Sequence, residues 1–187
     1  MKILFTTRSW CNEANGNYPK YYPFIEEDDK SILNELMDEA TSYFDFAHKI
    51  CNLVVRERTS DNLAYIAAVQ AWWCRLEEAM TVIQVKYGEV PYIKPWRYIH
   101  ATDFKDQEEN HDRVVESIDE AIESSPPDWI VIELHLLHAF FHYPFHGDIP
   151  SLIEPLEKAK VLVESNSLLN CFESLIDALE AWAKGLE

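Results

Sequence analysis

The fold of this 187-residue chain is decided by residues 29–58, which read DKSILNELMDEATSYFDFAHKICNLVVRER. Apolar side chains recur in this stretch at steps of three and four residues, the spacing that places side chains on one face of an α-helix. The residues that follow this spacing are Leu33, Leu36, Ala40, Tyr43, Phe44, Ala47, Ile50, Cys51 and Val54. The stretch therefore predicts one long amphipathic helix.

The same spacing continues toward the C-terminus and predicts five more helices. Capping residues at 59–62 separate the first two helices, so we expect these two to form an antiparallel hairpin. Gly88 stops the second helix, Pro144 ends the fourth, and Pro155 is expected in the first turn of the fifth. Trp129–Ile132 would also suit a buried strand, and this alternative stays open. The five helices are expected at residues 63–87, 107–124, 129–143, 151–164 and 168–182.

The predicted fold class is all-α (mainly α), with about six helices in antiparallel pairs and a single acidic domain over residues 1–187. Two parts of the chain lack helical periodicity. Residues 1–26 contain turn-forming residues and prolines, and they predict an irregular arm in which Lys2–Thr7 could form a short strand. Residues 88–106 alternate prolines with large aromatic side chains. They predict a loop that either packs on the core or is a recognition surface.

The composition disfavours several classes of protein. Only four glycines are present, and no glycine-rich phosphate-binding motif occurs, which argues against the usual nucleotide sites. The four cysteines are scattered without metal-binding spacing, as expected for free thiols in a reducing compartment. The apolar run near the N-terminus is too short for a signal peptide, and no window is apolar enough to span a membrane. We therefore expect a cytoplasmic protein with no membrane partner.

The net charge is −17, from 33 Asp and Glu residues against 16 Lys and Arg residues. Such a charge repels nucleic acid and speeds encounter with basic proteins, although solubility alone also accounts for it. Acidic residues are dense between Asp103 and Glu123, next to the aromatic loop. We expect these two segments to form a contact surface for a basic protein domain. The candidate partner-binding residues are Asp103, Asp106, Glu108, Glu109, Asp112, Glu116, Asp119, Glu120, Tyr92, Trp96 and Tyr98.

Histidines cluster near the predicted fourth helix. His135, His138 and His142 fall on one helical stripe, but the first and last lie two turns apart, about 10.5 Å, so they cannot easily share one ion. We interpret them as structural and expect no metal or cofactor. The alternative is a metal site built from His135, His138, His142 and His146. The pairs Asp45/His48 and Glu108/His111 have carboxylate–histidine spacing, which is weak evidence in a chain with 33 acids.

No complete catalytic motif occurs, so an enzyme is the less favoured class. A small, acidic, helical chain with an aromatic loop is typical of bacterial immunity proteins, which neutralise toxin domains that have basic clefts. The leading hypothesis is therefore an immunity protein that inhibits a toxin or nuclease-like domain. A helical adaptor module is the first alternative. A metal-dependent enzyme built on the segment His135–His146 is the second.

Overall fold

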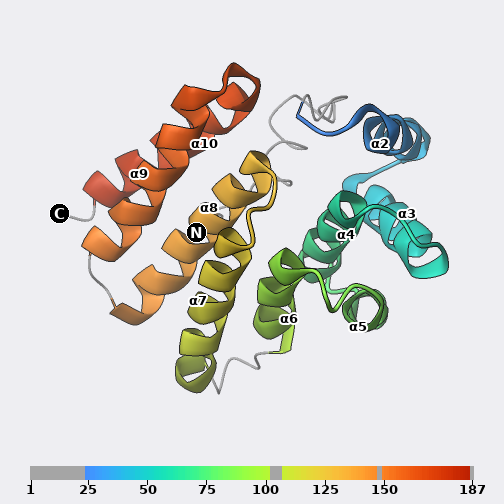
Figure 1. Ribbon diagram of the computed structural model, residues 1–187, viewed down its shortest axis with the longest axis horizontal. Helices are drawn as coiled ribbons and strands as arrows, with labels where there is room; N and C mark the ends of the chain where they lie inside the picture. The colour runs from blue at the N-terminus through green and yellow to red at the C-terminus, as the bar shows by residue number, and fades with distance from the viewer. Residues whose placement is uncertain (1–23, 102–106, 147–148, 186–187) are drawn as a thin grey trace. The chain divides into compact units, whose positions relative to one another are not determined.

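The computed structural model describes residues 24–101, 107–146 and 149–185, with side chains except at 100–101, 107–109 and 140–146 (Figure 1). Within these ranges the chain contains nine α-helices, two 3₁₀ helices and no strand, which confirms the all-α class. The predicted arm lies outside the described residues up to residue 23, and so does the short strand at Lys2–Thr7.

The described helices belong to two compact units, Met1–Ala101 and Thr102–Glu187. Two compact units can still belong to one domain, so the single domain over residues 1–187 stays a prediction.

The first unit is organised around a helix that has no polar face. Every residue of α4 from Leu63 to Ala71 is buried, and four of these nine residues are alanines. Small side chains let neighbouring helices approach closely, and α3 and α5 both pack against α4. The elements of this unit are α2 (Glu27–Glu39), α3 (Tyr43–Arg56), α4 (Asp61–Trp73), α5 (Glu77–Lys86), the 3₁₀ helix η1 (Pro91–Ile93) and α6 (Lys94–Ala101).

The first predicted helix is in fact two, because the chain turns between Glu39 and Tyr43. The hydroxyl of Ser42 accepts a hydrogen bond from the backbone N–H of Asp45 at 3.1 Å. The Asp45 carboxylate accepts one from the N–H of Thr41 at 2.9 Å, which is the main reason that its pKa lies below its ordinary value. This reciprocal capping starts α3 and was overlooked because the apolar spacing runs straight through it.

The second predicted helix is also two helices. It breaks between Trp73 and Glu77, where Arg75 has a left-handed backbone with φ of 56°. Such a conformation normally favours glycine, so the sequence carries no signal of this break.

The segment 88–106 was predicted as a loop, and this is wrong over residues 91–101, which form η1 and α6. Pro91 is the first residue of η1, and Pro95 is the second residue of α6. A proline at the first helical positions needs no N–H and has a suitable φ, so both prolines begin helices here. The two broken helices together with α6 raise the predicted six helices to nine in the described ranges.

The second unit is also built on a buried helix. The elements are α7 (Gln107–Glu123), α8 (Asp128–His146), α9 (Ile149–Ser165), the 3₁₀ helix η2 (Ser167–Phe172) and α10 (Glu173–Lys184). Of the α8 side chains from Trp129 to Ala139, only Val131 and His138 are not fully buried. Both α7 and α9 pack on this helix, and α10 packs on α9. The stretch Trp129–Ile132 is therefore helix, and not strand.

Two proline boundaries differ from the prediction. Helix α8 continues past Pro144 to His146, because a proline in a last turn removes a single hydrogen bond. Helix α9 begins at Ile149, with Pro150 second, so Pro155 lies in the second turn and is buried. Pro155 has no N–H for a helical hydrogen bond, and burial of its apolar ring offsets this loss.

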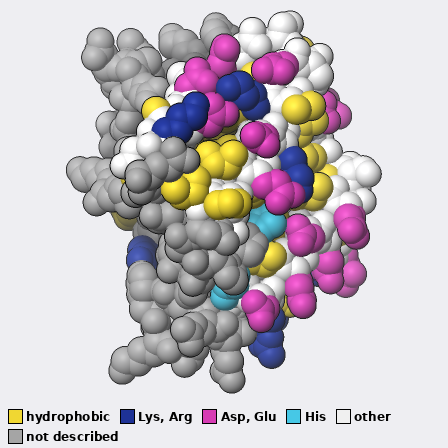
Figure 2. Space-filling model, turned by 90° about the vertical axis from the view of Figure 1, so that its left-hand side faces the viewer, with side chains coloured by type: hydrophobic (Ala, Val, Ile, Leu, Met, Phe, Trp, Pro, Cys, Tyr) yellow, Lys and Arg dark blue, Asp and Glu magenta, His cyan; other side chains and the backbone are white. Residues whose placement is uncertain are grey.

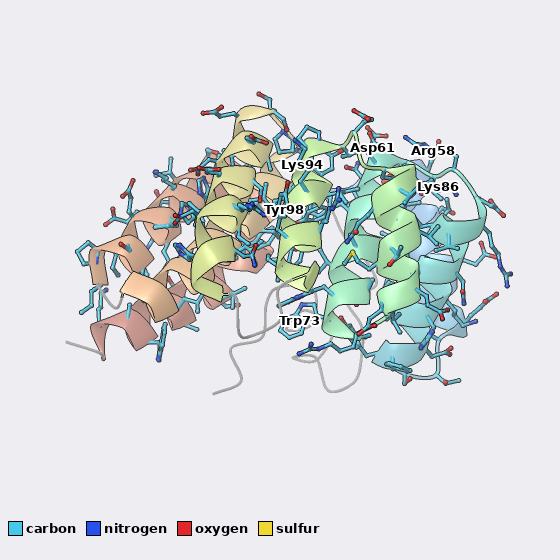
Figure 3. The ribbon with its side chains drawn as sticks, turned by 90° about the horizontal axis from the view of Figure 1, so that it is seen from below. Arg58, Asp61, Trp73, Lys86, Lys94 and Tyr98 are labelled. Carbon is cyan, nitrogen blue, oxygen red and sulfur yellow. The ribbon has the colours of Figure 1, made fainter. Side chains whose placement is uncertain are left out.

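A lysine joins two helices of the first unit. The ammonium of Lys86, at the end of α5, donates to the carbonyls of Val54 at 2.8 Å, Val55 at 3.2 Å and Glu57. These acceptors lie at the C-terminal end of α3, where carbonyls lack helical partners and the helix dipole favours a positive charge. The guanidinium of Arg58 donates to the carbonyl of Lys86, and both residues are labelled in Figure 3. The same guanidinium lies 4.2 Å from the centre of the Tyr87 ring.

Replacing Lys86 with methionine should lower the free energy of unfolding by about 1.5–3 kcal/mol, the usual range for hydrogen bonds to a charged group. Chemical denaturation followed by circular dichroism measures this loss. The control is Lys49→Met, which breaks only an exposed ion pair to Glu39 and should cost less than about 1 kcal/mol. Equal losses for the two variants would contradict a special role for Lys86.

Candidate interaction surface

The acidic residues of the predicted contact surface that the structure describes lie along α7. Asp112, Glu116 and Glu120 follow one another at steps of four, so they form one exposed stripe, and Asp119 is exposed beside it. Asp103 and Asp106 lie outside the described residues. Glu108 and Glu109 belong to α7, but their side chains are not described. The inner side of α7 is mainly apolar, with Val114, Ile118 and Ala121 buried, and it also buries His111 and Ser117.

The charge of the chain is divided unequally between the two units. Residues 1–101 carry 14 acidic and 11 basic side chains, a net charge of −3. Residues 102–187 carry 19 acidic and 5 basic side chains, a net charge of −14. The total charge conceals this division, which a count of charges along the chain reveals. Figure 2 shows one face of the molecule, with Asp and Glu side chains spread over its described part.

The few bases of the second unit do not neutralise this charge. Lys158 lies 2.8 Å from the Glu154 carboxylate, and Lys160 lies 3.2 Å from Glu180 and 3.9 Å from Asp177. The Glu180 carboxylate raises the pKa of Lys160, which stays charged. On α7 the exposed carboxylates outnumber the bases, because Arg113 is the one basic residue in that helix.

The three aromatic residues predicted for the contact surface belong to the first unit. Trp96 is 1% exposed, and its ring packs against Tyr65 and Trp72 with centroids 6.1 Å and 5.4 Å away. Tyr92 and Tyr98 are half-buried, and burial raises the pKa of Tyr92 to about 12. Trp96 is therefore a core residue of its unit, whereas Tyr92 and Tyr98 keep part of their surface accessible.

The histidines on α8 have different surroundings. His135 is buried, and its Nδ1 finds no hydrogen-bond partner among the described residues. His138 is half-buried, with Nδ1 3.9 Å from the Asp119 carboxylate of α7. The side chains of His142 and His146 lie outside the described set. Within the described part of the chain, no three His, Cys, Asp or Glu side chains come together in a way that could hold a metal ion.

Burial is also the main reason that the pKa of His135 falls to about 4, followed by the positive charge of Lys158 on α9. His138 lowers this pKa further, and Asp119 raises it by a smaller amount. His135 is thus neutral in the folded protein at neutral pH. Its place in the core supports a structural role.

Comparisons with protein families, curated proteins and solved structures find no match to this chain. No helix in the described ranges is long and apolar enough to cross a membrane.

We predict that Trp96→Ala lowers the free energy of unfolding by about 3–5 kcal/mol, the usual cost of removing a fully buried aromatic side chain. Tyr98→Ala is the control and should cost less, because Tyr98 is only half-buried. Denaturant titrations of both variants measure the difference. A Trp96→Ala variant as stable as the wild type would show that this ring does not support the core.

We also predict that His135 makes the protein less stable as the pH falls from about 6.5 to about 4. In this window the unfolded chain binds a proton at residue 135 and the folded chain does not, so the free energy of unfolding decreases. The variant His135→Leu should lose less stability over the same window. Identical profiles for His135→Leu and wild type would contradict the prediction.

Proposed function

We propose that this protein is an acidic cytoplasmic binding protein that inhibits a basic protein domain, as an immunity protein neutralises a nuclease-like toxin. The single observation that carries the proposal is the net charge of −14 in residues 102–187. Solubility requires no such concentration of charge in one half of a chain, because a moderate and evenly spread charge suffices.

The exposed stripe on α7 is the contact surface in this proposal. Its carboxylates stand one helical turn apart on a helix whose other face is held in the core, so the surface is rigid. Rigid anionic groups at regular spacing resemble a row of phosphates. A basic cleft that binds nucleic acid would therefore accept this surface and be blocked by it.

Electrostatic steering gives such an inhibitor a fast association rate. Complementary charge raises association rates well above the neutral range of about 10⁵–10⁶ M⁻¹s⁻¹, and the increase is lost when salt screens the charges. Lasting affinity needs buried contacts in addition. Tyr92 and Tyr98 remain candidates for these contacts because both are partly exposed.

The test is to reverse the charges of the stripe with Asp112→Lys, Glu116→Lys and Glu120→Lys in one variant. The partner is first captured from the native host at low salt, and its own activity is measured with and without this protein. We expect the reversals to slow association at least tenfold at low salt and to weaken its dependence on salt. Stopped-flow kinetics measure both effects.

The matched control reverses three exposed acids of the first unit with Glu35→Lys, Asp38→Lys and Glu57→Lys. Both variants have the same net charge of −11, so only the location of the change differs. The control should slow association much less. Equal effects of the two variants would contradict α7 as the contact, and a captured partner that keeps its full activity would contradict inhibition.

A further inference from the structure

The first unit has an open groove between two of its helices. Its volume is about 500 Å³, in the range of sites that hold several large side chains. Cys51 and Val55 of α3 line one wall, and Leu76, Ala79 and Val82 line the other. These walls are mainly apolar, and the groove is open at the surface of the described chain.

Apolar surface continues beyond both ends of the groove. On α3, Phe44 is 53% exposed, and its ring meets that of His48 in an edge-on contact with centroids 4.4 Å apart. His48 itself lines the groove. On α5, Val82 is 39% exposed, and Val85, one turn further along the same face, is 83% exposed. Exposed side chains of this size that adjoin a groove indicate a contact surface.

The rim of the groove carries charges of both signs within one turn of chain. Arg75 stands just before α5, and Glu77 and Glu78 open that helix. All three side chains are exposed, and no ion pair joins any of them to another residue in the described ranges. When two identical surfaces meet across a twofold axis, each residue can face a different residue of the same patch. A patch with one base beside two acids can therefore form ion pairs with an identical patch on a second copy.

The charge division between the units also favours contact through this surface. Two copies of a chain with net charge −17 repel each other, and most of that charge belongs to residues 102–187. The first unit has a net charge of only −3, so its own side chains add little repulsion to a contact through the groove.

We infer that the groove between α3 and α5 is an interface between two copies of this chain, related by a twofold axis. Val82 and Val85 of each copy contact the groove of its partner, and Arg75 of each copy faces Glu77 or Glu78 of its partner. This inference does not rest on the proposed function, because it uses none of the acidic residues of α7.

Sedimentation equilibrium of the full chain from about 1 to 200 µM tests the inference, because weak dimers have dissociation constants in this range. We expect the mean mass to rise from that of one chain, 21.9 kDa, toward twice that value. The variant Val85→Lys should raise the dissociation constant at least tenfold, because it places a charge where Val85 would contact the partner's apolar groove. This residue is so exposed that the change leaves folding intact, which circular dichroism checks.

The matched control is Val161→Lys on α9, since Val161 is also a valine, 64% exposed, but lies in the second unit. It adds the same charge and should leave dimerisation unchanged. Charge complementarity is tested separately: Arg75→Glu should weaken the dimer, and Glu78→Arg added to it should restore association. A mass of one chain throughout the concentration range overturns the inference. So does a dimer that Val161→Lys weakens as much as Val85→Lys.

Discussion

The burial of two helices on all sides is the constraint on which the rest of the structure depends. Neither α4 nor α8 has a polar face along its buried stretch, so neither is stable in water without neighbours around it. The outer helices meet this requirement with apolar stripes of their own. Their polar sides are left as the surface of each unit, and every candidate contact of the protein is built from those outer helices.

Apolar spacing was a sufficient guide to the fold class and to most of the helical stretches, but it missed α6. The spacing did not locate the ends of helices. When the chain turns and the next helix continues the same apolar spacing, the pattern shows no break. At Thr41–Asp45 a local signal existed, since Ser42 and Asp45 form a capping pair. At Arg75 no residue type marks the break, although the backbone closes the helix locally, with the N–H of Leu76 donating to the carbonyl of Ala71 at 2.9 Å.

The candidate site was predicted only in part, because residue spacing indicates which side chains face water but not which helices pack together. Acidic residues on α7 are exposed as the sequence suggests, because charged side chains on an amphipathic helix face water. Trp96 was placed in a loop, yet it begins a helix and packs on Tyr65. The groove between α3 and α5 has no signature in the sequence, since its walls come from helices some twenty residues apart. Only tertiary packing brings them together.

The tryptophans of the first unit give the protein an optical property of its own. The rings of Trp72 and Trp73 have centroids 4.8 Å apart at an interplanar angle of 61°, and Trp72 also contacts Trp96. Indole transitions held this close in a fixed chiral arrangement couple, and they give a circular dichroism signal in the near ultraviolet that vanishes when tertiary packing loosens. Tertiary order around these rings therefore contributes a signal that needs no label, while α-helix content is followed in the far ultraviolet.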